Sequence, residues 1–459
     1  MLGRMLTAFE EGRRRVLLSG LDAEGEILWA QTGEDLLARV GAWQRLMDAR
    51  GVRPGDRVAV AVPRGPEILA LHVAVLASGA TVVPINPALS RVERDRILER
   101  ADLAALLAEG DIPPSGGTPS LRELPADRPA LLVFTSGTTG EPKGVPLTEQ
   151  NLEANLSALT EAWGLRAGDR ILHVLPVHHL HGLVLALYGS ARIGLPILLD
   201  SRFDAPRAIR SLARHGATVF MGVPTMYHRM ASAEGSDDLS GVRLFVCGSA
   251  PLSPADHRAF ASRFGHRPVE RYGLTETMIV TTNPLEGERR PGTVGPPLPG
   301  VEVRIAPDGE IEVRGPSVMP GYWQAPDLSE EAFDAGFFRT GDLGIWDDHG
   351  YLVISGRKKD LILVGGSNVL PGEVEHALGD VAGLDEIAVA GIPDADLGEV
   401  VGAFVVARLG ERPVDLESRL RDRAEADLSP YKRPRLYRFV ESLPRNAMGK
   451  IDRKGLIER

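Results

Sequence analysis

Helical and strand patterns alternate along the first 120 residues of the chain. Residues 34–50 and 68–78 have the pattern of helices, and short β-rich runs occupy residues 57–62 and 81–85. Strands that alternate with helices predict a mostly parallel sheet with helices on both faces. The run at 111–127 is rich in Pro, Gly and Ser, so we expect a surface connection there.

The alternation resumes beyond this connection, with predicted strands at 130–134, 171–175, 216–223 and 242–247 and a predicted helix at 147–164. Between Thr293 and Arg314 the pattern changes to alternating apolar and polar residues around Pro and Gly turns, which is typical of antiparallel strands. The chain beyond Arg357 has the length of a small domain. Its predicted elements are strands at 361–364, 387–390 and 400–407 and helices at 372–378 and 416–426.

We therefore predict an α/β fold in three parts. A large N-terminal domain of mixed and parallel sheets, sandwiched by helices and carrying a β-rich subdomain, spans residues 1–356. A charged link follows at 357–360, and a small α+β domain spans 361–459.

Composition narrows the range of functions. The chain has 459 residues, with 52 Lys and Arg against 62 Asp and Glu, which gives a formal net charge of −10. This acidic balance argues against nucleic acid as a partner. It does not exclude nucleotides, because phosphates are bound locally by backbone N–H groups and a few cations. The single cysteine, Cys247, excludes a disulfide framework and a Cys-rich metal site.

Two long apolar stretches, 68–85 and 180–199, are interrupted by polar residues and proline, so we predict no membrane span. The N-terminal residues lack an apolar run of signal-peptide length before their charges begin. We expect a cytoplasmic protein.

The most informative motif is TSGTTGEPKG at 135–144, directly after a predicted buried strand. Its three glycines permit backbone conformations that other residues avoid, and its four hydroxyls and consecutive N–H groups can surround phosphate oxygens. Lys143 adds a mobile positive charge. The motif is not a Walker A loop, because Pro142 stands where that pattern requires glycine before its lysine, and Gly144 follows Lys143.

Three further clusters carry candidate chemistry. In RYGLTET at 271–277, a tyrosine can stack on a purine, a threonine can bind phosphate and a glutamate can bind Mg²⁺. In FRTGDL at 338–343, an aspartate can bind both hydroxyls of a ribose, and an arginine follows in GRKKD at 356–360. The last cluster is PRNAMGK at 444–450. Taken alone, its lysine would be interpreted as a solvent-exposed surface charge.

Together, and in this order, these four clusters resemble the adenylate-forming superfamily of acyl-CoA synthetases, peptide-synthetase adenylation domains and beetle luciferases. The resemblance extends from about Ile27 to Ile457, and TSGTTGEPKG with RTGDL…GRKKD carries it most specifically. It implies two half-reactions. A carboxylic acid and MgATP form an acyl-adenylate and pyrophosphate, and a thiol, usually coenzyme A, then displaces AMP.

The resemblance also implies a nucleotide site. The β- and γ-phosphates of ATP would be bound by Thr135, Ser136, Gly137, Thr138, Thr139, Gly140 and Lys143. The adenine would be framed by Gly248, Ser249, Ala250 and Tyr272, together with Arg271 and Gly273. Thr275 would bind the α-phosphate and Glu276 the Mg²⁺, while Asp342 would bind the ribose hydroxyls with Arg357 beside them.

The same resemblance assigns roles to the C-terminal part of the chain. Lys450 would reach the α-phosphate and the carboxylate as they join, where a desolvated ammonium stabilises the developing negative charge. Lys359 matches the hinge position of the family, at which a rotation swings the small domain. That swing would present Gly365 and Gly366 to the pantetheine arm of CoA, as part of a narrow tunnel.

The acid is less clearly indicated. The stretch PVHHLHG at 176–182 matches the acyl-pocket motif of the family, with His179 expected to pack as a gate and not to act as a base. We also assign His181 and Met278 to this pocket.

Two arginines favour an acid with a second carboxylate. The stretches GVPTMYHR and ERYGLTET, which contain Arg229 and Arg271, resemble malonyl-CoA synthetases. An arginine is the usual partner of a carboxylate in an apolar pocket, so we predict malonate or methylmalonate as the favoured acid. The alternative places Arg229 on a helix surface and pairs Arg271 with a neighbouring acid such as Glu270.

Other activities stay open. A short- or medium-chain fatty acid is the second candidate substrate, since the GRKKDLILVGG and NPLEGERRPGTVGPPLPG segments resemble fatty acyl-CoA ligases equally well. The thiol could belong to an acyl-carrier protein instead of CoA, and the enzyme could be a monomer or a homodimer. Nothing speaks for oxygen chemistry of the luciferase type. A non-catalytic scaffold would be expected to lose Lys450, Glu276 or the TSGTTG loop, and all three are present.

Overall fold

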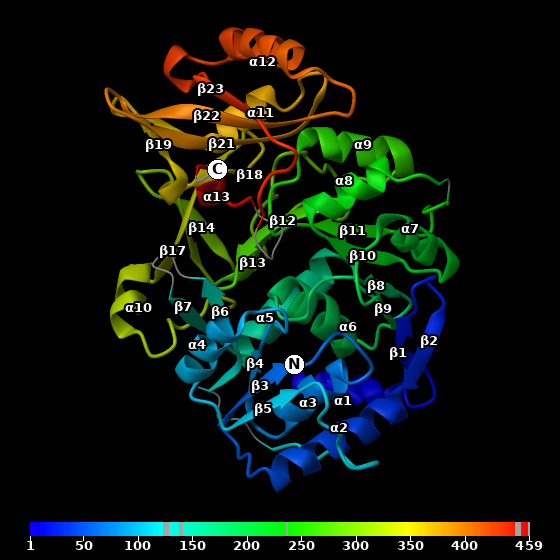
Figure 1. Ribbon diagram of the computed structural model, residues 1–459. Coiled ribbons are helices and arrows are strands. Elements are labelled where there is room, and N and C mark those ends of the chain that lie inside the picture. Colours follow the sequence, from blue (N-terminus) through cyan, green and yellow to red (C-terminus); the bar gives the residue numbers. More distant parts are fainter. Residues whose placement is uncertain (123–127, 137–140, 236, 446–450, 458–459) are drawn as a thin grey trace.

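The computed structural model describes residues 1–122, 128–136, 141–235, 237–445 and 451–457. Figure 1 shows a large body, coloured blue to yellow, with a smaller orange and red unit above it. The predicted α/β fold class, with a large N-terminal part of mixed sheets and a C-terminal domain, is confirmed.

The first sheet of the large body consists of β3 (Arg57–Ala61), β4 (Thr81–Pro84), β5 (Ala105–Ala108), β6 (Pro129–Ser136) and β7 (Pro142–Thr148). Its strand order is β5-β3-β4-β6-β7, and all neighbouring pairs are parallel except β6 with β7. Residues 57–108 therefore supply the parallel strands that their alternating pattern predicts.

The second sheet has eight strands. They are β1 (Val16–Leu21), β2 (Ile27–Thr32), β8 (Ile171–His173), β9 (Ile197–Leu199), β10 (Val219–Gly222), β11 (Leu244–Cys247), β12 (Val269–Leu274) and β13 (Met278–Thr282). In the order β13-β12-β11-β10-β8-β9-β1-β2, the central pairs are parallel and the two edge pairs are antiparallel.

Helices cover these sheets. They are α1 (Leu2–Glu11), α2 (Gly33–Ala49), α3 (Ile68–Ala77), α4 (Arg91–Ala101), α5 (Glu149–Ala162), the π-helix η1 (His181–Tyr188), α6 (Gly189–Arg192), α7 (Ala205–Arg214), α8 (Pro224–Ser232) and α9 (Pro254–Phe264). Several starts follow sequence signals. Thr32, Ser90 and Thr148 each form a capping box with the residue three positions later, and α7, α8 and α9 carry proline in the first turn.

The main core lies between the two sheets. It joins Val58 of β3 and Leu199 of β9 to helices α2, α3, α5 and η1. Every residue of α3 is buried, and its His72 lies 2.7 Å from the Tyr188 hydroxyl of η1. A helix enclosed on all sides needs no polar face, which explains why residues 68–77 are almost wholly apolar. Helices α7 to α9 cover the outer face of the eight-stranded sheet, and α4 covers that of the five-stranded sheet.

The β-rich part follows as predicted. Its strands are β14 (Glu302–Ile305), β15 (Glu310–Arg314), β16 (Phe333–Asp334), β17 (Phe337–Trp346) and β18 (Leu352–Arg357), and α10 (Pro326–Ala332) lies beside them. All of its pairs are antiparallel.

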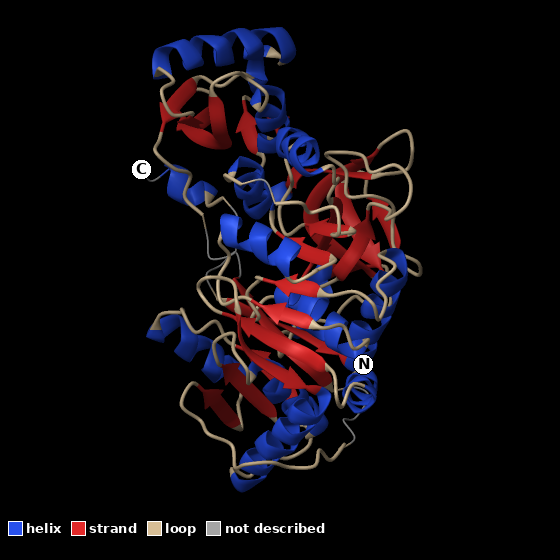
Figure 2. Ribbon diagram, turned by 90° about the vertical axis from the view of Figure 1, so that its right-hand side faces the viewer, coloured by secondary structure: helices blue, strands red, loops and turns tan. Residues whose placement is uncertain are grey.

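The C-terminal unit has its own sheet and its own core. The strands are β19 (Ile362–Val364), β20 (Ser367–Val369), β21 (Leu384–Asp394), β22 (Gly398–Ala407) and β23 (Leu436–Phe439). The helices are α11 (Pro371–Leu378), α12 (Pro413–Asp427) and α13 (Arg453–Ile457), with short 3₁₀ helices η2 (Lys358–Asp360) and η3 (Pro430–Lys432). Figure 2 shows α12 on the outer side of this sheet, away from the large body.

One local expectation is corrected. The sequence suggested a strand, then a ten-residue loop, then a helix, but β6 continues through Ser136 and pairs with a second strand, β7. Thr135 lies opposite Lys143 and Ser136 opposite Pro142. The residues beyond Pro142 include Val145, Pro146 and Leu147, and the buried Val145 and Leu147 make the segment suitable for an edge strand.

No helix within the described ranges combines the length and the apolar character that crossing a membrane requires.

Candidate active site

The connection between β12 and β13 holds the RYGLTET motif in a tight turn. Leu274 pairs with Met278, and the Leu274 N–H donates to the Thr277 hydroxyl at 3.1 Å. A Cβ atom on Gly273 would lie 1.8 Å from the Met278 carbonyl oxygen, so only glycine permits this approach. Thr275 and Glu276 lie within the turn.

Tyr272, Asp342 and Arg357 meet where β12, β17 and β18 come together. The Tyr272 hydroxyl donates to Asp342 Oδ2 at 2.7 Å, and Arg357 Nε lies 3.1 Å from Asp342 Oδ1. Burial and the neighbouring carboxylate raise the pKa of the Tyr272 hydroxyl, so it remains a hydrogen-bond donor. The structure thus brings together three residues that the resemblance assigned to adenine and ribose.

Glu276 contacts Tyr322, whose ring lies beside Lys143, and both of these residues come from other segments. The Tyr322 hydroxyl donates to Glu276 Oε1 at 3.2 Å, and Lys143 Nζ lies 5.2 Å from the centre of the Tyr322 ring. Burial raises the pKa of the Glu276 carboxyl, and the Tyr322 hydrogen bond and the charge of Lys143 oppose that rise. Tyr322 was missed at the sequence level because no motif marks it.

Arg271, Ser249 and His181 form a second, buried cluster. Arg271 Nη2 donates to Ser249 Oγ at 3.4 Å, and the same hydroxyl lies 3.4 Å from His181 Nδ1. Arg271 is 5% exposed and His181 is 7% exposed. Among the described residues, Arg271 Nε and His181 Nε2 have no hydrogen-bond partner. Ser249 brings its hydroxyl to this cluster from a left-handed backbone, with φ of 73°.

This cluster has the electrostatics of an anion receptor. Burial lowers the pKa of Arg271 to about 10, and burial with the nearby Arg271 charge lowers the pKa of His181 well below its usual value. Near pH 7 the cluster therefore presents one fixed positive charge beside a neutral imidazole. A buried cation with an unsatisfied N–H is stabilised when an anion binds.

Glu270 does not neutralise Arg271. Its carboxyl accepts hydrogen bonds from the backbone N–H groups of Gly292 and Leu252, and burial raises its pKa to about 8. Adjacent residues of a strand point to opposite faces, which separates the two side chains of β12. The alternative in which Arg271 pairs with this neighbour is therefore not what the structure contains.

Arg229 lies elsewhere. It is exposed on α8, whose buried face carries Tyr227 and Met230. It borders a hollow of about 380 Å³ together with residues 203–206. The structure therefore does not bring Arg229 to Arg271, in agreement with the helix-surface alternative.

The other residues assigned to the acid and to CoA are placed as follows. His179 is half-buried, with its ring edge-on to His178 at a centroid separation of 4.4 Å, and Met278 is buried. Gly365 and Gly366, with φ of 55° and 83°, form the exposed turn between β19 and β20. Positive φ at both positions of a two-residue turn favours glycine.

The remaining predictions concern the TSGTTGEPKG segment and Lys450. The Thr135 hydroxyl donates to the Lys143 carbonyl oxygen at 3.4 Å, so both ends of the TSGTTGEPKG segment lie side by side in the β6–β7 hairpin. Five predicted residues lie outside the described residues, namely Gly137, Thr138, Thr139, Gly140 and Lys450.

Comparison with known proteins identifies the family. The family model described as AMP-binding enzyme matches residues 28–120 and 109–323, and that of the AMP-binding enzyme C-terminal domain matches residues 373–450. The chain therefore belongs to the AMP-binding enzyme family. It is an acid–thiol ligase, the enzyme class of its curated relatives.

Two relatives and one solved structure are informative. The chain is 37% identical to a sulfoacetate–CoA ligase of Cupriavidus necator, over 92% of this chain and 91% of that protein. It is 39% identical to a malonate–CoA ligase of Arabidopsis thaliana, over 72% of this chain and 60% of that protein. The crystal structure of ATP-bound MatB from Rhodopseudomonas palustris superposes with a TM-score of 0.90 at 32% identity, covering 100% of this chain and 99% of that one.

Proposed function

We propose that the protein is an AMP-forming acyl-CoA synthetase whose favoured acid is malonate or methylmalonate. The reaction joins a carboxylate, ATP and CoA to give acyl-CoA, AMP and pyrophosphate. The observation that carries the choice of acid is the buried Arg271, which has one long hydrogen bond to Ser249 and an unsatisfied Nε.

Nucleotide binding is assigned to the Tyr272–Asp342–Arg357 group and to the TSGTTGEPKG segment. The two carboxylate oxygens of Asp342 can accept both ribose hydroxyls, and Arg357 can bridge from the ribose towards the phosphates. Tyr272 supplies a ring face for the adenine. Lys143 and the N–H groups of the TSGTTGEPKG segment supply positive potential for the β- and γ-phosphates.

Glu276 has the chemistry of a magnesium ligand. It is a half-buried carboxylate that lies within reach of the positive charge of Lys143, and hard oxygen ligands of this kind suit Mg²⁺. When bound, the ion would neutralise charge on the phosphate oxygens as pyrophosphate leaves. Tyr322 holds the Glu276 carboxylate by its hydroxyl and so orients the ligand before the nucleotide arrives.

In the first half-reaction, a carboxylate oxygen of the acid attacks the α-phosphorus and pyrophosphate departs. No general base is needed, because a carboxylic acid is already ionised near pH 7. Thr275 would donate to the α-phosphate, and Lys450 would stabilise the charge that builds up at phosphorus. In the second half-reaction, the sulfur of CoA attacks the acyl carbon, the bond to AMP breaks and the thiol proton is released.

The two half-reactions require the small domain to turn. We assign this turn to Lys359, within the link 357–360 that separates domains 1–356 and 361–459. After the turn, the exposed glycine turn at Gly365 and Gly366 would lie along the pantetheine arm, where the absence of side chains leaves room for it.

The preference for a second anionic group follows from charge. In an acid such as malonate, the reacting carboxylate is joined to a second carboxylate, and sulfoacetate, the substrate named for one relative, carries a sulfonate in that place. Arg271 can pair with such a group in a desolvated site, where charge-assisted hydrogen bonds are strong. Arg229, exposed on α8, is not required for this pairing.

The proposal is tested by acid-dependent AMP release. Purified protein with MgATP and CoA is supplied in turn with malonate, methylmalonate, sulfoacetate, acetate, butyrate, octanoate, palmitate and benzoate. Turnover of malonate well above that of butyrate supports the proposal. Turnover of butyrate or octanoate without malonate would identify a fatty acyl-CoA ligase instead. Activity with a phosphopantetheinylated carrier protein and none with CoA would identify the other thiol.

A further inference from the structure

The link between the two domains contains three consecutive basic residues whose surroundings differ. Arg357 is bound to Asp342 of the proposed nucleotide site. Lys358 is half-buried against the β-rich sheet, whereas Lys359 is exposed and has no polar partner among the described residues. This change within three residues limits where the chain can rotate.

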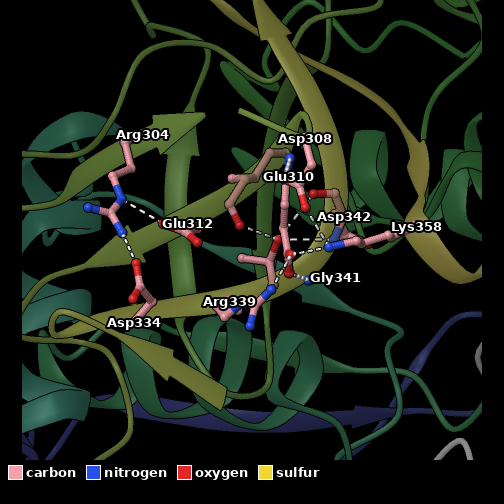
Figure 3. A network of polar contacts seen from close by, with 11 residues as sticks. Arg304, Asp308, Glu310, Glu312, Asp334, Arg339, Gly341, Asp342 and Lys358 are labelled. Atoms are coloured by element: carbon pink, nitrogen blue, oxygen red, sulfur yellow. Dashed lines mark hydrogen bonds and ion pairs between the residues drawn. The ribbon is translucent and has the colours of Figure 1, made fainter. Parts of the chain in front are cut away.

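Lys358 is attached to the large domain by two carboxylates. Its Nζ lies 2.6 Å from Asp308 Oδ2 and 3.0 Å from Glu310 Oε2, and both acids raise its pKa. Asp308 stands in the turn before β15, and Glu310, only 4% exposed, is the first residue of that strand. Figure 3 shows the Lys358 side chain extending towards these two residues.

The same glutamate also contacts the part of β17 that belongs to the proposed nucleotide site. Glu310 Oε1 accepts the Gly341 N–H at 2.9 Å, directly before Asp342, and Arg339 lies 3.5 Å from Glu310 Oε2. One buried carboxylate therefore contacts both the link and the residue that precedes the proposed ribose ligand (Figure 3).

Beyond Lys359 the contacts belong to the small domain. Asp360 faces Arg453 at 3.9 Å, and Arg453 donates to Glu375 at 2.7 Å and to the Val389 carbonyl oxygen at 3.0 Å. Lys358 is thus bound to the large domain, whereas Asp360 contacts the small domain. A rotation that keeps both sets of contacts must occur at Lys359.

We propose that Lys358, Asp308 and Glu310 form a clamp that restricts the domain rotation to Lys359, while Glu310 also keeps the Gly341–Asp342 segment of β17 in place. Lys358 is a positioning residue in this proposal, which rests on the two-step function proposed above. Without the clamp, rotation can begin at Lys358 as well. The small domain then samples more orientations and spends less time in each productive one.

The first test measures opening of the link in the full-length protein without substrates, by the initial rate of trypsin cleavage after residues 357–359. Asp308→Asn keeps all tryptic sites and removes one charge of the clamp. Asp334→Asn is the matched control, because Asp334 pairs with Arg304 at 2.7 Å in the same sheet, away from the link (Figure 3). We expect about 2- to 5-fold faster cleavage in Asp308→Asn, the range for one partly exposed ion pair, and an unchanged rate in the control.

The second test measures the half-reactions in Lys358→Met. We expect both adenylate formation and thioester formation from supplied acyl-adenylate to slow by about 2- to 5-fold, with KM for ATP unchanged because Glu310 still holds Gly341. Equal cleavage in Asp308→Asn and Asp334→Asn would overturn the clamp whatever the reaction catalysed. Slowing of one half-reaction alone would overturn it as well, because a clamp acts on both orientations.

Discussion

Replacing Arg271 by methionine tests the proposed anion receptor most directly. Methionine has a similar length and no charge, so it fills the space beside Ser249 without the guanidinium. The structure predicts opposite effects on stability and on activity, because Arg271 is buried, lacks an ion-pair partner in the described structure and has only a long hydrogen bond to Ser249.

The stability effect follows from the pKa of Arg271, which burial lowers from 12.5 to about 10. Each pH unit corresponds to about 1.4 kcal/mol, so the buried charge costs the ligand-free protein about 3 kcal/mol at neutral pH. The penalty is fully present below pH 10 and is relieved as the pH rises from about 10 towards 12.5. We therefore expect Arg271→Met to raise the free energy of unfolding by up to about 3 kcal/mol near pH 7.

The activity effect has the opposite sign. A hydrogen bond to a charged group contributes about 1.5–3 kcal/mol, so kcat/KM for malonate should fall by about 10- to 150-fold. The value for butyrate should change by less than about threefold, since butyrate has no second anion to lose a partner. Urea unfolding and CoA-dependent AMP release measure the two effects.

Arg229→Met is the matched control, because it makes the same substitution at an exposed arginine of α8. If the two variants lost malonate activity equally, Arg271 would not be the receptor. An equal loss for malonate and butyrate in Arg271→Met would show a structural role. A less stable variant would contradict the burial argument.

Three further predictions concern the nucleotide site and its support. Lys450→Ala should slow adenylate formation, measured by pyrophosphate release, by at least about 100-fold. It should leave thioester formation from supplied acyl-adenylate, measured by acyl-CoA yield, unchanged. Equal loss of both steps would contradict the role of Lys450. Tyr272→Phe removes the 2.7 Å hydrogen bond to Asp342 and should raise KM for ATP by about 2- to 10-fold, with KM for the acid unchanged; an unchanged KM for ATP would argue against this site. Glu270 has a folded-state pKa of about 8, above its unfolded value near 4.5, so the free energy of unfolding should fall as the pH rises from 4.5 to 8. In Glu270→Gln, the free energy of unfolding in urea should therefore decrease less between pH 5.5 and pH 8 than in the native protein.

Much of the fold was predictable because its signals are local. The alternation of helices and strands in the first 120 residues, the antiparallel pattern around residues 293–314 and the elements beyond Arg357 all appear in the structure. The hairpin of β6 and β7 was not predicted. The glycine-rich composition of the motif indicated a loop, and therefore the strand that begins at Pro142 was not recognised. An edge strand needs a partner, and composition does not reveal the partner.

The sequence by itself determined the fold class and the family, because the motifs are contiguous and their order along the chain is specific. It also selected the candidate residues of the nucleotide site. Only the tertiary structure decided which of these residues meet. Strand geometry turned Arg271 away from Glu270, and the face of α8 left Arg229 in solvent.

The tertiary structure also supplied partners that no motif contains. Tyr322 reaches Glu276 across 46 positions of the chain, and Glu310 joins Gly341 to Lys358 across 31 and 48 positions. Such contacts depend on how the sheets pack and on which buried polar groups still need a hydrogen-bond partner. Spacing along a single chain does not specify these conditions, and so the chemistry of the candidate residues was readable from the sequence whereas their arrangement required the fold.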